Sequence, residues 1–241
     1  MEAPLEVTAL LPALAAGYAA CARVERPSRA RIAAFAAGLA LIFAAFSTRL
    51  EPLALHTFLW AHLLQNVVLA EWAPALLVLA VPPALATRVR VPAVPALVVW
   101  LATYFLWHLP WCYDAALRRP HWLLHLEHLC YLVAGCLFWW PVIHGRLAAG
   151  AKAAYLFSAF VLASPLGLML ALLPKPVYSI YEAAAPTWGI GALTDQEIAG
   201  ATMAGEQAAV LFAVFAVVFS RFLAAEQGAG ALDELRPRPL R

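Results

Sequence analysis

Three histidines near the middle of the chain have the spacing of a metal-binding helix face. His121, His125 and His128 are separated by four and three residues, so on a helix all three point to one side. By helical rise His121 and His128 lie about 10 Å apart along the axis, whereas His125 and His128 lie about 4.5 Å apart. His125 and His128 could therefore bind one ion together, and imidazole suits copper, zinc and haem iron.

We expect His125 and His128 to form a functional site together with two further histidines, His62 and His108. Ionisable groups in apolar segments are costly, and they usually face a bundle interior or a cavity. Hydrogen bonding near a helix end, without any ligand, is the competing interpretation. We favour it for His56, and both interpretations stay open for His121.

Other polar residues lie close to His62 in the sequence. Gln65 and Asn66 follow it by three and four residues, which predicts a polar stripe on one helix face. Hydrogen bonding between helices is the plain explanation for such a stripe. Glu71 falls roughly opposite His62 around the helix, so we do not expect it to share the same site.

Three residues elsewhere allow more than one role. Glu127 is either a partner of the neighbouring histidines or an ion-pair member for Arg118 or Arg119. Asp195 stands where the N-cap of the last long helix is expected. Met203 is either ordinary packing or a soft thioether ligand for Cu(I), and it joins the metal candidates.

The composition requires a bilayer around these residues. Of 241 residues, 64% are hydrophobic and 12% are charged, whereas soluble domains carry about 25% charged residues. The net charge of +2 and the lack of a basic patch argue against nucleic acid as a partner. The four cysteines form no CxxC pair, which argues against a zinc ribbon or a thiolate copper carrier.

Seven apolar stretches are long enough to position the histidines in a membrane, since about 20 helical residues cross the hydrocarbon core. They fall at roughly 5–22, 31–48, 53–81, 92–113, 121–143, 152–173 and 197–223. We therefore predict an all-α polytopic membrane protein with seven transmembrane helices. Residues 1–225 form its transmembrane domain, and residues 226–241 form a short cytoplasmic tail.

Loop charges predict the orientation. Alternate loops divide the lysines and arginines twelve to four between the two sides, and the richer side is cytoplasmic. The richer side has Arg23, Arg26, Arg29, Arg31, Arg88, Arg90, Arg146, Lys152, Arg221, Arg236, Arg238 and Arg241. The poorer side has Arg49, Arg118, Arg119 and Lys175. We expect the N-terminus outside, the C-terminus in the cytoplasm, and every histidine except His144 towards the outside.

The polar motifs together resemble the CtaG-type family of cytochrome c oxidase assembly factors. The likeness spans about residues 53 to 205 and rests on the order and helix placement of four segments. These are His62–Asn66 with Pro74 and Pro82, Trp107–Pro110 with Tyr113 and Asp114, His125–His128 with Phe138–Pro141, and Asp195–Gln196 with Ala199, Gly200 and Met203.

The resemblance implies a seven-helix protein of the bacterial inner membrane that helps haem-copper oxidases mature and delivers copper to their subunits. By position, His62, His108, His125 and His128 match the family's recurring histidines. Where the family has a second histidine in the His-Met-x-Gln-His stretch this chain has Asn66, and its methionine is Leu63. A metal site built on that histidine pair would lose a ligand.

These observations lead to a non-enzymatic assembly factor that exchanges copper between ligands on the outer side. A haem-binding subunit is one alternative, because two histidines on facing helices could ligate haem iron. A structural subunit held beside an oxidase is another, and homo-oligomers remain open. A retinal pump is excluded, because Lys152 and Lys175 are the only lysines and neither lies in the last helix.

Overall fold

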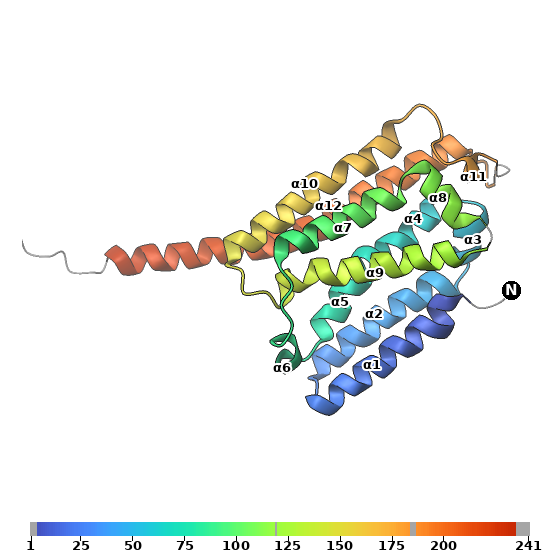
Figure 1. Cartoon of the computed structure of the whole chain (residues 1–241). Helices are drawn as coiled ribbons and strands as arrows, with labels where there is room; N and C mark the ends of the chain where they lie inside the picture. The colour runs from blue at the N-terminus through green and yellow to red at the C-terminus, as the bar shows by residue number, and fades with distance from the viewer. Residues whose placement is uncertain (1–3, 119, 184–186, 235–241) are drawn as a thin grey trace, which may run out of the picture.

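The computed structural model describes residues 4–118, 120–183 and 187–234, and every regular element within those ranges is a helix (Figure 1). The helices in chain order are η1 (Glu6–Leu10), α1 (Leu11–Val24), α2 (Arg29–Ser47), α3 (Leu50–His56), α4 (Leu59–Val67), η2 (Val68–Trp72), α5 (Ala73–Ala80), α6 (Pro83–Ala86), α7 (Ala93–Trp107), α8 (Pro110–Leu117), α9 (Trp122–Ile143), α10 (Ala149–Leu172), α11 (Ser179–Glu182) and α12 (Ala192–Glu234). The predicted all-α class is confirmed.

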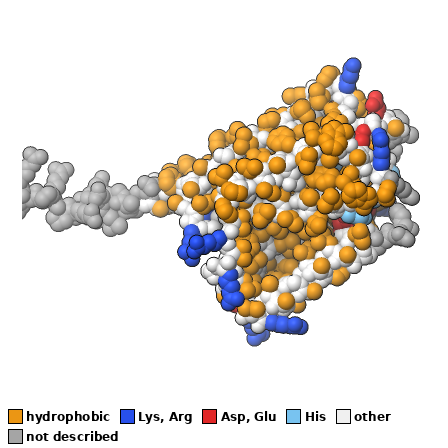
Figure 2. All heavy atoms as spheres, in the orientation of Figure 1, with side chains coloured by type: hydrophobic (Ala, Val, Ile, Leu, Met, Phe, Trp, Pro, Cys, Tyr) orange, Lys and Arg blue, Asp and Glu red, His pale blue; other side chains and the backbone are white. Residues whose placement is uncertain are grey.

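Six helical stretches in the described ranges are long and apolar enough to cross a membrane, and α7 with α8 forms a seventh if that bent pair is one span. Hydrophobic side chains cover the flank of the bundle, and the charged ones gather at its two ends (Figure 2). An apolar flank between polar ends is the surface that a bilayer requires. The protein is therefore a multi-pass membrane protein.

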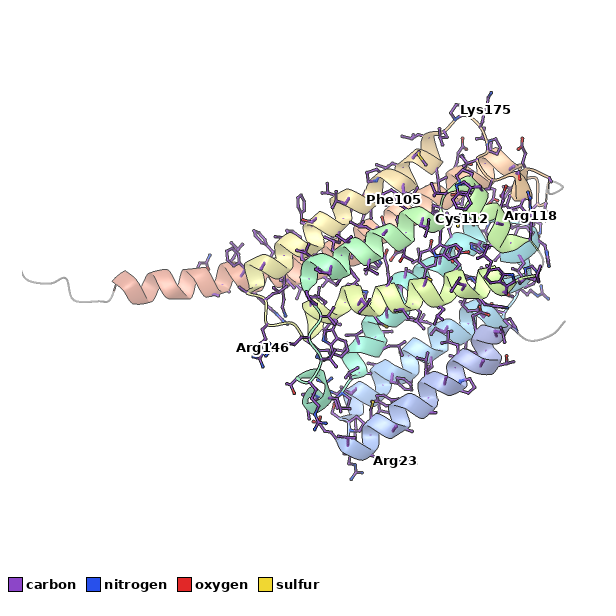
Figure 3. The ribbon with its side chains drawn as sticks, in the orientation of Figure 1. Arg23, Phe105, Cys112, Arg118, Arg146 and Lys175 are labelled. Atoms are coloured by element: carbon purple, nitrogen blue, oxygen red, sulfur yellow. The ribbon has the colours of Figure 1, made fainter. Side chains whose placement is uncertain are left out.

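The two ends of the bundle carry the charged residues that the sequence assigned to opposite sides. Arg23 and Arg146 lie at one end, and Arg118 and Lys175 lie at the other (Figure 3). The chain enters η1 at the Arg118 end, and α12 leaves the bundle at the opposite end (Figure 1). This arrangement fits an odd number of spans, while the side that faces the cytoplasm stays a prediction.

Two of the predicted spans are interrupted, and proline accounts for one break. The predicted stretch 92–113 divides into α7 and α8, which meet at 74°. Pro110 opens α8, where its missing N–H costs nothing. The predicted stretch 53–81 also divides, because Thr57 and Phe58 leave helical geometry and separate α3 from the membrane-crossing run of α4, η2 and α5.

A wider helical turn in that crossing run accommodates Pro74. A proline ring clashes with the carbonyl four residues earlier, here that of Ala70, and it lacks the N–H to bond it. The turn at η2 widens, and the Trp100 indole donates to the Ala70 carbonyl oxygen at 3.4 Å. The Trp139 indole donates to the Glu71 carbonyl oxygen at 2.9 Å.

Small residues bring the long helices into backbone contact. A Cβ atom added at Gly135 of α9 would lie 2.3 Å from the Ala70 carbonyl oxygen. One added at Gly200 of α12 would lie 2.4 Å from the backbone nitrogen of Ala171 in α10. Close approach through small residues is a principal source of packing energy in membranes. It sets α9 directly against η2, which brings the histidines of α9 towards α4.

Candidate metal centre

Three side chains converge where α9 begins. Glu6, from the first turn of η1, places one carboxylate oxygen 2.7 Å from Nδ1 of His125 and 2.7 Å from Nδ1 of His128. Glu6 is 3% exposed and His128 is 2% exposed, while His125 is half-buried. The ligand atoms of the three residues lie within 4.8 Å of one another, which is compatible with one metal ion.

The shared oxygen fixes how the two histidines present their other nitrogens. An ionised carboxylate only accepts hydrogen bonds, so each Nδ1 donates its proton to Glu6. Nε2 of each neutral ring then carries a lone pair, the form in which imidazole binds metals. A carboxylate behind a metal-binding histidine is the common second partner that orients the ring. Nε2 of His128 has no hydrogen-bond partner within the described ranges.

His62 lies beside this group on α4. Its ring is fully buried, and its centroid is 6.0 Å from that of His128. Neither ring nitrogen of His62 forms a hydrogen bond with any described residue, although the Glu127 carboxylate lies 3.5 Å from Nε2. His62 of α4 and His128 of α9 are thus neighbouring rings from two helices.

The polar stripe on α4 forms the hydrogen bonds between helices that the sequence predicted. Asn66 donates from its side-chain amide to Glu127 at 3.0 Å. Gln65 donates to the Ala45 carbonyl at 2.9 Å and to the Glu51 carboxylate at 2.6 Å. Burial raises the pKa of Glu51, an effect that the Gln65 hydrogen bond opposes. Asn66 therefore supports Glu127 beside His62.

His108 occupies the break between α7 and α8. Its Nδ1 donates to the Tyr104 carbonyl oxygen at 2.7 Å, and its buried Nε2 has no partner among the described residues. Tyr113 separates it from His62, with ring centroids 6.1 Å from His108 and 5.1 Å from His62. The bend after Trp107 thus turns His108 inward, one aromatic ring away from His62.

Met203 is buried in the hydrophobic core on α12. The Asp195 carboxylate accepts from the Leu59 backbone N–H at 2.6 Å, which sets the start of α12 level with the start of α4. Counting from that level, helical rise places Met203 about 7 Å deeper than His62. Its part in metal binding stays a prediction.

Two further histidines lie at the surface of the same end. His56 and His121 line a cavity of about 290 Å³, together with Leu117 and Tyr181. His144 lies at the opposite end, as expected, and its Nε2 donates to the Val78 carbonyl oxygen at 2.8 Å. Burial lowers the pKa of His144.

The structure corrects the expectation for Asp195 and favours one of the two alternatives for Glu127. Asp195 does not cap its own helix, which already begins at Ala192; its carboxylate accepts from the backbone N–H groups of Leu59 and Trp60, so it caps α4. Glu127 faces the histidines and not the arginines, because Arg118 pairs with Asp114 at 3.9 Å. Arg119 lies outside the described residues.

Glu6 is the site residue that sequence reasoning missed. A carboxylate at the start of an apolar stretch was a usable signal, because such a group needs a partner inside the protein. Glu6 lies 119 residues before His125, so helical spacing could not relate it to the histidines.

The comparison with known families agrees with a helical membrane bundle that carries these motifs. A family model described as cytochrome c oxidase caa3 assembly factor matches residues 14–225. No curated protein and no solved structure matches the chain. Since the matched range covers all the described spans except the first turns of the bundle, the chain belongs to the cytochrome c oxidase caa3 assembly factor family.

Proposed function

We propose that this assembly factor holds a copper ion at the histidine cluster and passes it to a haem-copper oxidase subunit. The observation that carries the proposal is the pair of buried rings of His62 and His128, whose centroids lie 6.0 Å apart. Both nitrogens of His62 and Nε2 of His128 have no hydrogen-bond partner among the described residues. Buried polar atoms are nearly always paired, so unpaired ones call for a ligand. For one ion to bind both rings at about 2.0–2.1 Å, the two facing nitrogens must come within about 4.2 Å of each other.

The set of ligands fits a copper ion that the protein carries and releases. Imidazole binds copper. Glu6 and Glu127 lie next to the rings and supply the negative charge that a cation needs in an apolar interior. His108 is a neighbouring imidazole, one Tyr113 ring away from His62, and Met203 is a candidate soft ligand.

Release requires that the ion is not enclosed by protein ligands. Glu6 belongs to the N-terminal span, which has no buried residue between Leu11 and Val24. His56 and His121 border a surface cavity at the same end, on the side that loop charges predict to be outside. Ligand exchange through this end would pass the ion to a partner without crossing the membrane. The step is ligand exchange and not catalysis.

The first test is metal analysis of the detergent-purified protein together with its visible absorption spectrum. Near-stoichiometric copper without a Soret band is the expected result. The variant His62→Gln with His128→Gln keeps polar side chains of similar volume, and it should lose the copper while remaining folded. His56→Gln, at the exposed rim, is the matched control and should retain copper.

Two results would contradict the proposal. Unchanged copper in the double variant would remove the assigned site, and a Soret band would favour the haem-binding subunit. A folded protein that takes up neither metal nor haem would favour a structural subunit beside the oxidase.

A further inference from the structure

Two carboxyl groups that the metal site does not use meet deep inside the bundle. Glu71 of η2 is fully buried, and Glu206 of α12 is half-buried. By helical rise Glu71 lies about 18 Å from the start of its crossing run, Leu59–Ala80, whose 22 residues span about 33 Å. The pair therefore lies near the middle of the membrane, where an ionisable side chain is a functional candidate by default.

The surroundings of the pair provide hydrogen-bond donors but no cation. Gln207 donates to one oxygen of Glu71 at 3.4 Å, and the Trp72 indole donates to one oxygen of Glu206. In the described ranges, neither carboxylate forms an ion pair with lysine or arginine. Two carboxylates in contact in an apolar interior cannot both be ionised.

Three oxygens at this place lack a partner among the described residues. They are the second oxygen of Glu71, the second oxygen of Glu206 and the side-chain oxygen of Gln207. Gln207 is fully buried, and its amide is held by Glu71 and by the Tyr104 hydroxyl at 2.7 Å. The two carboxyl groups are neighbours, because Trp72, next to Glu71 in the chain, donates to Glu206, and Gln207, next to Glu206, donates to Glu71. A hydrogen bond between carboxyl groups needs a proton on one of them.

We propose that Glu71 and Glu206 form a proton-binding site in the membrane interior, in which one carboxyl carries a proton and donates it to the other. A single proton supplies the missing donor for both groups and leaves one negative charge. The N–H groups of Trp72 and Gln207 stabilise that charge.

The backbone around Glu71 is held in place for this role. Trp139 donates to the Glu71 carbonyl oxygen, within the widened turn before Pro74. Widened turns of this kind occur often at functional sites. Among the described residues, the titratable side chain that faces the pair, besides the two acids, is Tyr104 on α7. The side chain of α9 at this place is the Trp139 indole.

Tyr104 lies between the pair and His108. Gln207 donates to the Tyr104 hydroxyl, and the Tyr104 carbonyl oxygen accepts from His108. These two bonds involve different groups of Tyr104, the hydroxyl and the backbone carbonyl. The binding of the proton itself does not depend on the copper proposal.

The test uses the metal-free full-length protein in detergent and infrared spectroscopy of the carboxylic acid C=O stretch. The double variant Glu71→Gln with Glu206→Gln should lose a C=O band that the unmodified protein shows at neutral pH and that shifts in heavy water. Glu197→Gln, an exposed change on the same helix, should keep the band. Copper plays no part in this measurement, so its outcome is separate from the outcome for the metal site.

Thermal unfolding against pH gives a second readout. Glutamine resembles a protonated carboxyl, so the double variant should match the unmodified protein at acidic pH and unfold at a higher temperature at alkaline pH. The unmodified protein loses stability there because the pair must keep a proton that the unfolded chain releases. The absence of a band difference would overturn the proposal. So would stabilisation of the unmodified protein, but not of the double variant, by sodium or a divalent cation.

Discussion

Replacing Glu6 with glutamine is expected to weaken copper binding by about 10- to 100-fold, the usual effect of removing a carboxylate behind a metal-binding histidine. One Glu6 oxygen lies 2.7 Å from Nδ1 of both His125 and His128, so a single change affects two rings. A tenfold change corresponds to about 1.4 kcal/mol, which gives a loss of about 1.4 to 2.7 kcal/mol. Glutamine keeps the size of the side chain and an acceptor oxygen, so the loss measures the charge.

The affinity is best measured by competition for Cu(I) with a coloured chelator, under anaerobic conditions and in one detergent. Glu197→Gln removes an exposed carboxylate from α12 and controls for the change in net charge. A Glu6→Gln affinity within twofold of the unmodified protein would refute the orienting role. A higher affinity would show that Glu6 competes with the ion for Nδ1, which would refute the assignment of Nε2 as the ligand atom.

Three further outcomes are expected. Asp195→Asn should destabilise the protein by about 0.5–2 kcal/mol, the typical cost of losing a helix cap, and a thermal melt with Glu197→Gln as control measures it. Gly135→Ala should sharply reduce the yield of folded protein, because its methyl group meets a backbone carbonyl, whereas Gly205→Ala has open space and should be tolerated. A reporter enzyme that is active only outside the cytoplasm should work when fused before the first span and fail after residue 225; the reverse pattern would invert the predicted topology.

Hydropathy alone located most of the bundle. The predicted stretches 31–48, 121–143 and 152–173 agree within a few residues with α2, α9 and α10. The breaks at Thr57–Phe58 and before Pro110 were missed, because apolar residues continue through both. Hydropathy measures transfer into lipid, and it does not respond to a bend between two apolar helices.

In the histidine cluster, too, the sequence predicted contacts within one helix better than contacts between helices. Helical spacing placed His125 and His128 on one face, and they meet there. Spacing within one helix cannot show which face of another helix is opposite. The grouping of His62 with His128 rested on the cost of ionisable groups in apolar segments, and the family resemblance agreed with it. Neither helical spacing nor the family resemblance indicated Glu6, since only packing of the first span against α9 brings it to the site.

The cap that Asp195 provides for α4 has a consequence for the order in which the chain is assembled during synthesis. The third crossing emerges from the ribosome about 135 residues before the aspartate that satisfies its first N–H groups. Until the last crossing is inserted, Leu59 and Trp60 must hydrogen-bond with water or lipid headgroups at the membrane surface. The end of the third crossing that carries His62 therefore receives its cap only after residue 195 has been synthesised. A nascent chain that stops before residue 195 would have all its histidines but no finished site.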